Sequence, residues 1–416
     1  MEKLAIDGGA PVRAVPLPSA YPGGRQIGAE EIAAVTEVLS YKSPFRYYGP
    51  EPQYTVQKFE RAFAEKFGRK FALGTTSGTA ALLIALKGVG VGPGDKVIVP
   101  ALSFVATAGA VVAAGAVPVF AEIDDSLSLV PSEIDRLADA HTKAVIAVPL
   151  HGNPCRMDEI VQRARAHGLK VVEDVAQSCG SKYHGKYSGS YGDAAAFSMQ
   201  LNKIISTGDG GVVVTDDPVV FERMARFHDQ GSFREKDKYP ELAGQPDLQM
   251  FGQNLRMNEM SGAVACIQLR RLDGIVASMR EKKAYVKAAL SDLPGVRFRT
   301  VNDPDGDAGC TLCMFLPTRE QAARWSEATA AEGAGWWFAY GGVPTYLIPF
   351  VRDQLTADGH YPFCLLDEPV RYYEGMCPQT EDVCSRNVEI NFDPTYTQAD
   401  LDDVVAIAKK VAHYVL

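Results

Sequence analysis

The chain has 416 residues, more than one hydrophobic core usually serves, so we expect two structural units. Hydrophobic residues make up 46% of the sequence and charged residues 22%, which is typical of globular proteins and unlike fibrous or disordered chains. The 42 basic and 51 acidic residues give a net charge of -9, and the basic residues form no clustered stripe. We therefore expect no nucleic-acid partner.

From about residue 70 to residue 217, short apolar runs alternate with segments of helical spacing. The runs are continuous in apolar character, as expected for strands that are covered on both faces. We predict strands over residues 70–75, 96–101, 117–123, 144–150, 170–175, 194–199 and 212–215. Strands that alternate with helices indicate an α/β fold with a mainly parallel, seven-stranded sheet between helices. Ligands of such sheets bind at the carboxyl ends of the strands.

After Asp217 the pattern changes, and residues 257–293 predict either one long helix or two abutting helices. From about Pro294 the sequence predicts a small α/β unit, with strands at 297–301, 311–317 and 388–394 and helices at 320–333 and 399–415. We therefore expect a large domain with an N-terminal arm over residues 1–270. Residues 271–416 would form the linking helix and a small C-terminal domain.

Two features of the sequence indicate where in the cell the protein is found. The N-terminal sequence MEKLAIDGGAPVRAVPLP lacks the apolar core of a signal peptide. The uncharged stretch 101–121 is long enough to span a membrane, but it is rich in small residues and contains Pro118. It therefore predicts a buried helix followed by a strand. We expect a cytoplasmic protein with no membrane partner.

The eight cysteines have no framework spacing, which indicates reduced cysteines in a chain too long to need disulfides. Cys310 and Cys313 form a CxxC pair, but no second pair and no His spacing completes a zinc site. We expect core cysteines and no metal.

Three features that follow predicted strands suggest a binding site, although each also has an ordinary structural explanation. The segment TTSGTAAL (75–82) opens a helix and offers amide and hydroxyl groups to an anion, but any helix cap looks similar. Glu173 and Asp174 end a strand, and the period of two allows only one of them to face a given cleft; a strand-end carboxylate can also simply cap the next helix. Phe104 could stack on a ligand or pack in the core.

Lys203 is the most informative residue, because it lies in SMQLNKIISTGDGG (198–211), between an apolar strand and a glycine-rich turn. Lysine is rarely buried unless it is paired or used covalently. Desolvation would lower its pKa and make the neutral amine a nucleophile toward an aldehyde. An anion cradle, an aromatic plate, a carboxylate and such a lysine together match the needs of pyridoxal phosphate. In that arrangement the carboxylate keeps the pyridine nitrogen protonated and Lys203 forms a Schiff base.

Over essentially its whole length the sequence resembles the DegT/DnrJ/StrS family of sugar aminotransferases, which are fold type I pyridoxal phosphate enzymes. The resemblance rests on SGTAAL (77–82), PALSFVATA (100–108), VVEDVAQS (171–178), FSMQLNKIISTGDGG (197–211) and GQNLRMNEM (252–260). A departure from the usual GEGG is Asp209 in GDGG, a conservative change.

The resemblance implies a role for each matching residue. Lys203 would form the Schiff base and Asp174 would pair with the pyridine nitrogen, so these two are the expected catalytic residues. Gln177 would lie near the ring's phenolic oxygen, and Phe104 would stack on the ring. Gly78, Thr79 and Ser198 would bind the phosphate. Asn254 would reach the phosphate of the neighbouring subunit, which implies a homodimer with a shared active site.

The resemblance also implies a ping-pong reaction in which glutamate or glutamine donates an amino group to a carbonyl of a sugar, sugar acid or cyclitol. Two alternatives remain open from the sequence. Some relatives are sugar dehydratases in which histidine replaces the lysine, but this chain keeps Lys203. A non-catalytic sensor that binds the cofactor would be expected to carry a DNA-binding domain, and the sequence shows no such segment.

The acceptor is left open. FSMQ resembles cyclitol aminotransferases, whereas FRYYG (45–49), VFAEIDDSLSLVP (119–131) and FRTVNDPDGDAG (298–309) resemble enzymes that aminate an eight-carbon keto sugar acid. Candidate acceptor contacts are Arg46, Tyr47, His151 and Arg386, with WWFAYGG (336–342) as a wall. Arg46 could equally form a structural ion pair, and tryptophans pack in cores by default.

Overall fold

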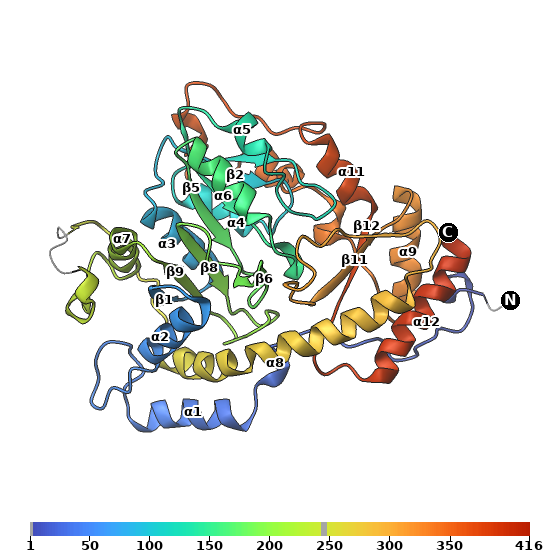
Figure 1. Cartoon of the computed structure of the whole chain (residues 1–416), viewed down its shortest axis with the longest axis horizontal. Coiled ribbons are helices and arrows are strands. Elements are labelled where there is room, and N and C mark those ends of the chain that lie inside the picture. Colours follow the sequence, from blue (N-terminus) through green and yellow to red (C-terminus); the bar gives the residue numbers. More distant parts are fainter. Residues whose placement is uncertain (1–2, 243–247) are drawn as a thin grey trace.

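The computed structural model describes residues 3–242 and 248–416. These residues form two main sheets with helices around them and a two-stranded sheet of β6 (Lys182–Tyr183) and β7 (Lys186–Tyr187) (Figure 1). The larger sheet has seven strands in the order β1-β9-β8-β5-β4-β2-β3. The strands are Phe71–Thr75 (β1), Lys96–Pro100 (β2), Val117–Ala121 (β3), Thr142–Ala147 (β4), Lys170–Asp174 (β5), Ala194–Ser198 (β8) and Gly211–Thr215 (β9). All seven overlap the strands predicted from the sequence, so that prediction is confirmed.

The sheet is parallel except for one strand. β9 pairs antiparallel with both β1 and β8, while the other neighbouring pairs are parallel. Six strands therefore point the same way, and their carboxyl ends meet at one edge of the sheet. This is the edge at which an α/β sheet binds ligands.

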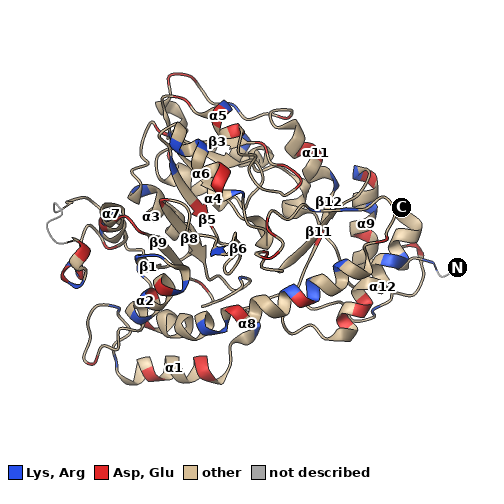
Figure 2. Ribbon diagram, viewed as in Figure 1, with Lys and Arg blue, Asp and Glu red and all other residues tan. Residues whose placement is uncertain are grey.

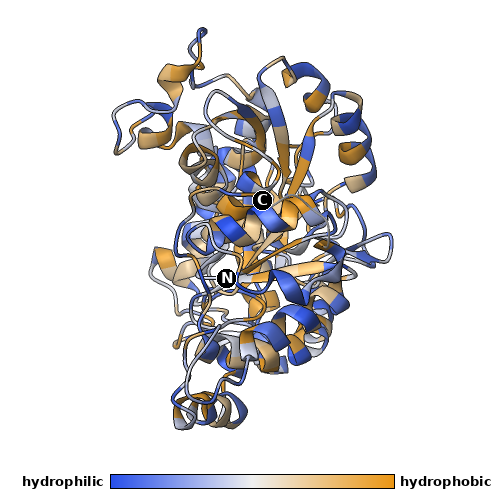
Figure 3. Cartoon of the chain, turned by 90° about the vertical axis from the view of Figure 1, so that its left-hand side faces the viewer, coloured by the Kyte–Doolittle hydropathy of each residue, from blue (hydrophilic) through white to orange (hydrophobic). Residues whose placement is uncertain are grey.

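Side chains of successive strand residues enter different cores, as the period of two requires. Leu73 and Val213 face a core shared with α3 (Gly78–Gly88), α4 (Ala106–Ala113) and α7 (Pro218–His228). On the other face, one half of the sheet packs against α2 (Thr55–Phe67) and the other half against α5 (Glu133–Leu137) and α6 (Met157–Ala166). Figure 3 shows hydrophobic strands between helices whose colours are more mixed. Burial on both faces explains why these strands are continuously apolar.

The long helix α8 (Glu259–Ala289) joins the two sheets. It begins after Asn258, whose side chain accepts a hydrogen bond of 2.9 Å from the Ser261 amide, a typical N-cap. One part of α8 contacts α1 (Ala29–Ser40) and α2, and a later part contacts the smaller sheet and α12 (Figure 1). The sequence allowed one helix or two, and the chain forms one.

The smaller sheet is antiparallel, with the order β10-β11-β12. Its strands are Arg297–Phe298 (β10), Thr311–Phe315 (β11) and Asn387–Asn391 (β12), and α9 (Arg319–Ala331) and α12 (Gln398–Val415) pack on it. A single apolar cluster contains Phe197 of the larger sheet and Ile390 of the smaller one. The chain between the last two strands returns to the larger sheet, through α10 (Pro349–Arg352) and α11 (Pro378–Arg386). The two sheets are thus joined by a shared core.

Basic and acidic residues are interleaved over α8, α9 and α12 (Figure 2). Within residues 3–242 and 248–416, no helix combines the length and apolar character that crossing a bilayer requires. The stretch 101–121 forms the loop after β2, then α4 and β3, so the predicted helix and strand are both present.

A buried ion pair supports the edge of the larger sheet next to β1. The Arg46 guanidinium lies 2.9 Å from Glu60 Oε1 of α2 and donates to the Gly74 carbonyl oxygen at 3.4 Å. Both side chains are almost fully buried, and Glu60 also accepts a hydrogen bond of 2.6 Å from the Gly74 amide. Arg46 therefore connects α2 to β1.

We predict that Arg46→Leu destabilises the fold by about 3 to 5 kcal/mol, because it leaves the Glu60 carboxylate buried without its partner. Urea unfolding of the purified protein measures this change. Arg270→Leu is the matched control, since its ion pair with Glu30 is exposed on both sides and contributes little. An equal loss of stability in the two variants would contradict the prediction.

Candidate active site

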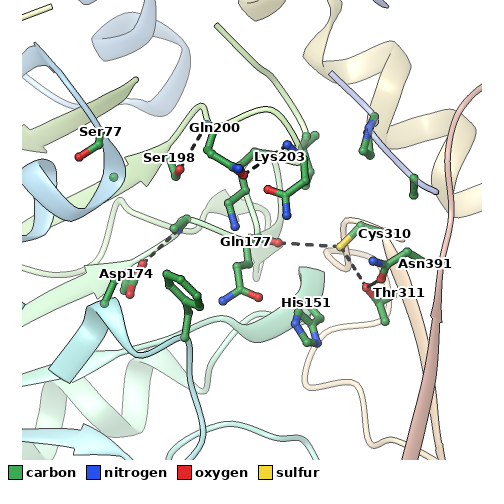
Figure 4. A pocket seen from close by; sticks show the side chains of 18 of the residues that line it. Ser77, His151, Asp174, Gln177, Ser198, Gln200, Lys203, Cys310, Thr311 and Asn391 are labelled. Carbon is green, nitrogen blue, oxygen red and sulfur yellow. Dashed lines mark hydrogen bonds between the residues drawn. The ribbon is translucent and has the colours of Figure 1, made fainter. Parts of the chain in front are cut away.

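A cavity of about 530 Å³ opens where the parallel strands end (Figure 4). Loops that follow β1, β2, β4, β5 and β8 supply most of its wall, and the smaller sheet and the N-terminal segment supply the rest. Eight of the twelve residues singled out from the sequence line it: Gly78, Thr79, Phe104, His151, Asp174, Gln177, Ser198 and Lys203. The topology therefore gathers residues that are up to 125 positions apart.

Lys203 lies in the turn that follows β8, and its side chain is partly buried at the wall of the cavity. Its amide donates to the Gln200 carbonyl oxygen at 2.9 Å, and its own carbonyl oxygen accepts from the Gly23 amide at 3.1 Å. Burial lowers the pKa of the Lys203 amine, and the Asp174 carboxylate partly opposes this shift. A larger fraction of the amine is therefore neutral, which is the nucleophilic form.

Asp174 ends β5 and is 5% exposed. Its Oδ2 accepts a hydrogen bond of 2.8 Å from the Thr107 hydroxyl, and its Oδ1 accepts one of 3.2 Å from the Ala176 amide. Burial raises the pKa of the carboxyl, while Thr107, Ala176 and the Lys203 charge act in the opposite direction. A cation bound beside Asp174 would favour the ionised form further.

The neighbouring carboxylate, Glu173, faces away from the cavity. Its two oxygens accept hydrogen bonds of 2.7 Å from the amides of Gly189, Tyr191 and Gly192. Glu173 therefore fixes the loop that precedes β8. Only one of the two adjacent carboxylates therefore lines the cavity, as the strand period requires, and it is Asp174.

The N-terminus of α3 meets the end of β8 at one corner of the cavity. The Ser77 side chain caps the helix by accepting a hydrogen bond of 3.1 Å from the Ala80 amide. The amides of Gly78 and Thr79, at the start of the helix, have no intrahelical partner. A Cβ atom on Gly78 would lie 2.6 Å from Ser198 Cβ, so only glycine permits this close approach. The first helix amides and the Ser198 side chain therefore lie together, in a geometry suited to an anion.

Aromatic side chains form another part of the wall. Phe104 is 53% exposed, which excludes a core role, and its ring lies 6.3 Å from that of Tyr340. Of the aromatic run at 336–342, only Tyr340 lines the cavity; Trp336 is buried in the core. The sequence indicated this wall without identifying its residue.

The smaller sheet contributes Cys310, Thr311 and Asn391, which the sequence analysis did not assign to the site. The Thr311 hydroxyl donates to Asn391 Oδ1 at 2.7 Å. Cys310 was expected in the core and instead lines the cavity, with Sγ 3.8 Å from the Gln177 carbonyl oxygen. No local motif marks these positions, because only the packing of one sheet on the other brings them to the site.

Four predicted residues lie outside the cavity of this chain: Arg46, Tyr47, Arg386 and Asn254. Arg46 forms the buried ion pair described above, and its guanidinium lies 4.8 Å from the centre of the Tyr47 ring. Arg386 pairs with Asp382 on α11 and donates to the Leu316 carbonyl oxygen. Asn254 is exposed and forms an isolated backbone bridge with Asp229. The functional roles of these four residues stay predictions.

No group of three or more His, Cys, Asp or Glu side chains in the described part of the chain is arranged to hold a metal. The donor set of the cavity instead matches pyridoxal phosphate. It combines an anion cradle that a Cβ atom would fill, a buried carboxylate and a desolvated amine.

Together, the mainly parallel sheet, the smaller C-terminal sheet and this cavity define the aminotransferase class of α/β enzymes. A sequence profile of the DegT/DnrJ/EryC1/StrS aminotransferase family matches residues 25–409. The chain belongs to this family and is an aminotransferase, which confirms the resemblance and the fold class predicted from the sequence.

Several characterised proteins are similar to the chain. The L-glutamine:2-deoxy-scyllo-inosose aminotransferase of Streptomyces paromomycinus is 30% identical over 99% of this chain and 98% of its own length. The GDP-perosamine synthase of Escherichia coli O157:H7 is 36% identical, but the match covers 57% of this chain and 64% of the synthase. The crystal structure of S. venezuelae DesV in complex with a ketimine intermediate superposes with a TM-score of 0.80 and 28% identity, over 96% of this chain and 99% of DesV.

We predict that Gly78→Ala weakens binding of pyridoxal phosphate at least about tenfold, because the added Cβ overlaps Ser198 and displaces the start of α3. Spectroscopic titration of the apoprotein with the cofactor measures the dissociation constant. Gly109→Ala, in the exposed part of α4 with nothing within 4 Å of the added Cβ, is the control. Unchanged binding in Gly78→Ala would contradict the assignment of the cradle.

Proposed function

We propose that the chain uses pyridoxal phosphate to transfer an amino group from glutamate or glutamine to a carbonyl of a sugar, sugar acid or cyclitol. The observation that carries this proposal is the presence of Lys203, Asp174 and the N-terminus of α3 in one cavity. The names of the relatives support it, because they include enzymes of amino sugars and of an amino cyclitol.

Different residues of the cavity would bind different parts of the cofactor. The amides of Gly78 and Thr79 and the Ser198 hydroxyl would hold its phosphate, and Phe104 would cover one face of its ring. Asp174 would pair with the ring nitrogen, and Gln177 would lie near the phenolic oxygen. When bound, the cofactor supplies an aldehyde for an amine and a ring that accepts electrons from the adjacent carbon.

Lys203 has two roles in the proposed reaction. Its neutral amine is the nucleophile that tethers the cofactor. Once a donor has displaced it, Lys203 Nζ would carry a proton from the donor's α-carbon to the C4′ carbon of the cofactor, and in the second half of the reaction from C4′ to the acceptor's carbon. Lys203 needs the neutral form to tether the cofactor and to take each proton, and the lowered pKa favours this form.

The shared active site of a homodimer also belongs to the proposal. Asn254 lies outside the cavity of its own chain and is exposed, so it is free to approach the phosphate of a neighbouring subunit. Ile32 and Leu39 of α1 are 66% and 53% exposed, and a dimer would cover apolar side chains of this kind. The division into domains at about residue 270 is likewise proposed.

We predict that Lys203→Ala lowers the rate of amino transfer by at least about 10²- to 10⁴-fold, because the tether and the proton carrier are lost together. The substituted protein should keep its fold, since the amine lies at a cavity wall. The measurement is the loss of visible absorbance when glutamate or glutamine is added to cofactor-loaded protein, followed by amine formation from a panel of keto sugars and inososes.

Lys186→Ala is the control for this experiment, since Lys186 is exposed on the short strand Lys186–Tyr187 and lies outside the cavity. Activity close to that of the unmodified chain in Lys203→Ala would remove the proposed mechanism. Visible absorbance that persists with both amino donors would instead favour a binding protein without catalysis.

A further inference from the structure

His151 lines the cavity and is paired with a buried carboxylate, and the proposed chemistry at Lys203 uses neither residue. His151, in the turn Leu150–Gly152 that follows β4, lies with its Nδ1 3.0 Å from Oε2 of Glu389 on β12. The pair therefore links the larger sheet to the smaller one. Figure 4 shows the His151 ring at the cavity wall, with Gln177 between it and Lys203.

The backbone at His151 is held in an unusual conformation. Its φ of 50° and ψ of 45° lie in the left-handed region, which a residue with a side chain rarely adopts. The Arg299 guanidinium donates to the carbonyl oxygens of Leu150 and His151, each at 3.2 Å, and the Gly152 amide donates to the Ser178 hydroxyl at 2.9 Å. The surrounding chain thus fixes the direction in which the imidazole leaves the backbone.

Glu389 is 2% exposed and has two polar partners. One oxygen contacts His151, and the other accepts a hydrogen bond of 3.1 Å from Trp337 Nε1. Within the described ranges, no Lys or Arg forms an ion pair with Glu389. With the Glu389 oxygen as the acceptor, we assign the hydrogen of this contact to His151 Nδ1.

This tautomer leaves Nε2 as the polar atom of His151 that is available to a ligand. The His151 ring packs at 5.7 Å from the Tyr340 ring, which fixes its plane. With Tyr340 and Phe104 it lines part of the cavity with flat side chains, and Nε2 adds a hydrogen-bonding atom there. Such a wall suits a ring that presents an apolar face and a hydroxyl at its edge.

We propose that His151 binds a ring hydroxyl of the amino acceptor through Nε2, and that Glu389 is its positioning residue. The inference rests on the proposed function and names the part of the cavity that selects a hydroxylated acceptor. Glutamate and glutamine carry no hydroxyl, so the pair serves the acceptor half of the reaction and not the donor half.

The test measures the two half-reactions separately. Glutamate or glutamine is added to the protein loaded with pyridoxal phosphate, and the acceptor probes are added to the protein loaded with pyridoxamine phosphate. The probes are scyllo-inosose, 2-deoxy-scyllo-inosose and a GDP-linked 4-ketohexose. We expect His151→Phe to lower the second-order rate constant for the best hydroxylated probe by about 10- to 100-fold, and to leave the donor half-reaction within about twofold.

Two further variants separate binding from structure. Glu389→Gln should lower the acceptor rate constant less than His151→Phe, and the ¹⁵N resonances of His151 should no longer report a single Nδ1-protonated tautomer. His167→Phe is the matched control, because His167 forms a histidine–aspartate contact of 2.9 Å with Asp135 on the exposed surface. It should change neither half-reaction.

Equal losses in both half-reactions, or no loss with the acceptor, would overturn the proposal. Failure of all three probes to react with protein that responds normally to the donor would overturn the ring-hydroxyl class of acceptor. Failure of unmodified protein to respond to any donor would count against the proposed function itself, so the two failures are distinguishable.

Discussion

The parallel direction of six strands is the constraint on which the site depends. Because β2, β4, β5 and β8 end at the same edge of the sheet, the residues that follow them converge. Asp174, His151, Phe104 and Lys203 each come from a different strand end, and no two of them are close in sequence. A reversal of any one strand would carry its residue to the opposite edge. The antiparallel strand β9 contributes its glycine-rich beginning to the same edge for this reason.

The amine of Lys203 gains its reactivity from burial, and burial is a product of both sheets. The smaller sheet closes the cavity with Cys310, Thr311 and Asn391, and the N-terminal segment adds Ala20 and Pro22. The long helix α8 and the shared apolar core hold the two sheets against each other. The chemistry of one lysine therefore depends on contacts made far from it along the chain.

The sequence predicted the elements whose signals are local. Continuous apolar runs identified all seven strands. The alternation of β5 allowed only one of Glu173 and Asp174 to face the site, and the family resemblance indicated Asp174. The serine, lysine and glycine spacing at 198–211 identified Lys203. These signals are strong because strand period, helix capping and turn chemistry act within a few residues.

The remaining features depend on long-range packing that no local pattern records. Asn391 and Cys310 enter the cavity because the smaller sheet shares an apolar core with the larger one, and Tyr340 does so because its segment packs on the core of the larger sheet. The sequence left open whether Arg46 contacts a ligand or forms a structural ion pair, because its partner Glu60 is brought beside it only by the packing of α2. The contact between His151 and Glu389, 238 residues apart, has no counterpart in either local sequence.

The most direct measurement of the central claim is reductive trapping. Protein loaded with pyridoxal phosphate is treated with sodium borohydride, digested and mapped by mass spectrometry. The account predicts that the phosphopyridoxyl mass is found on the peptide that contains Lys203. A label on another lysine, or fully loaded protein that carries no label, would contradict it.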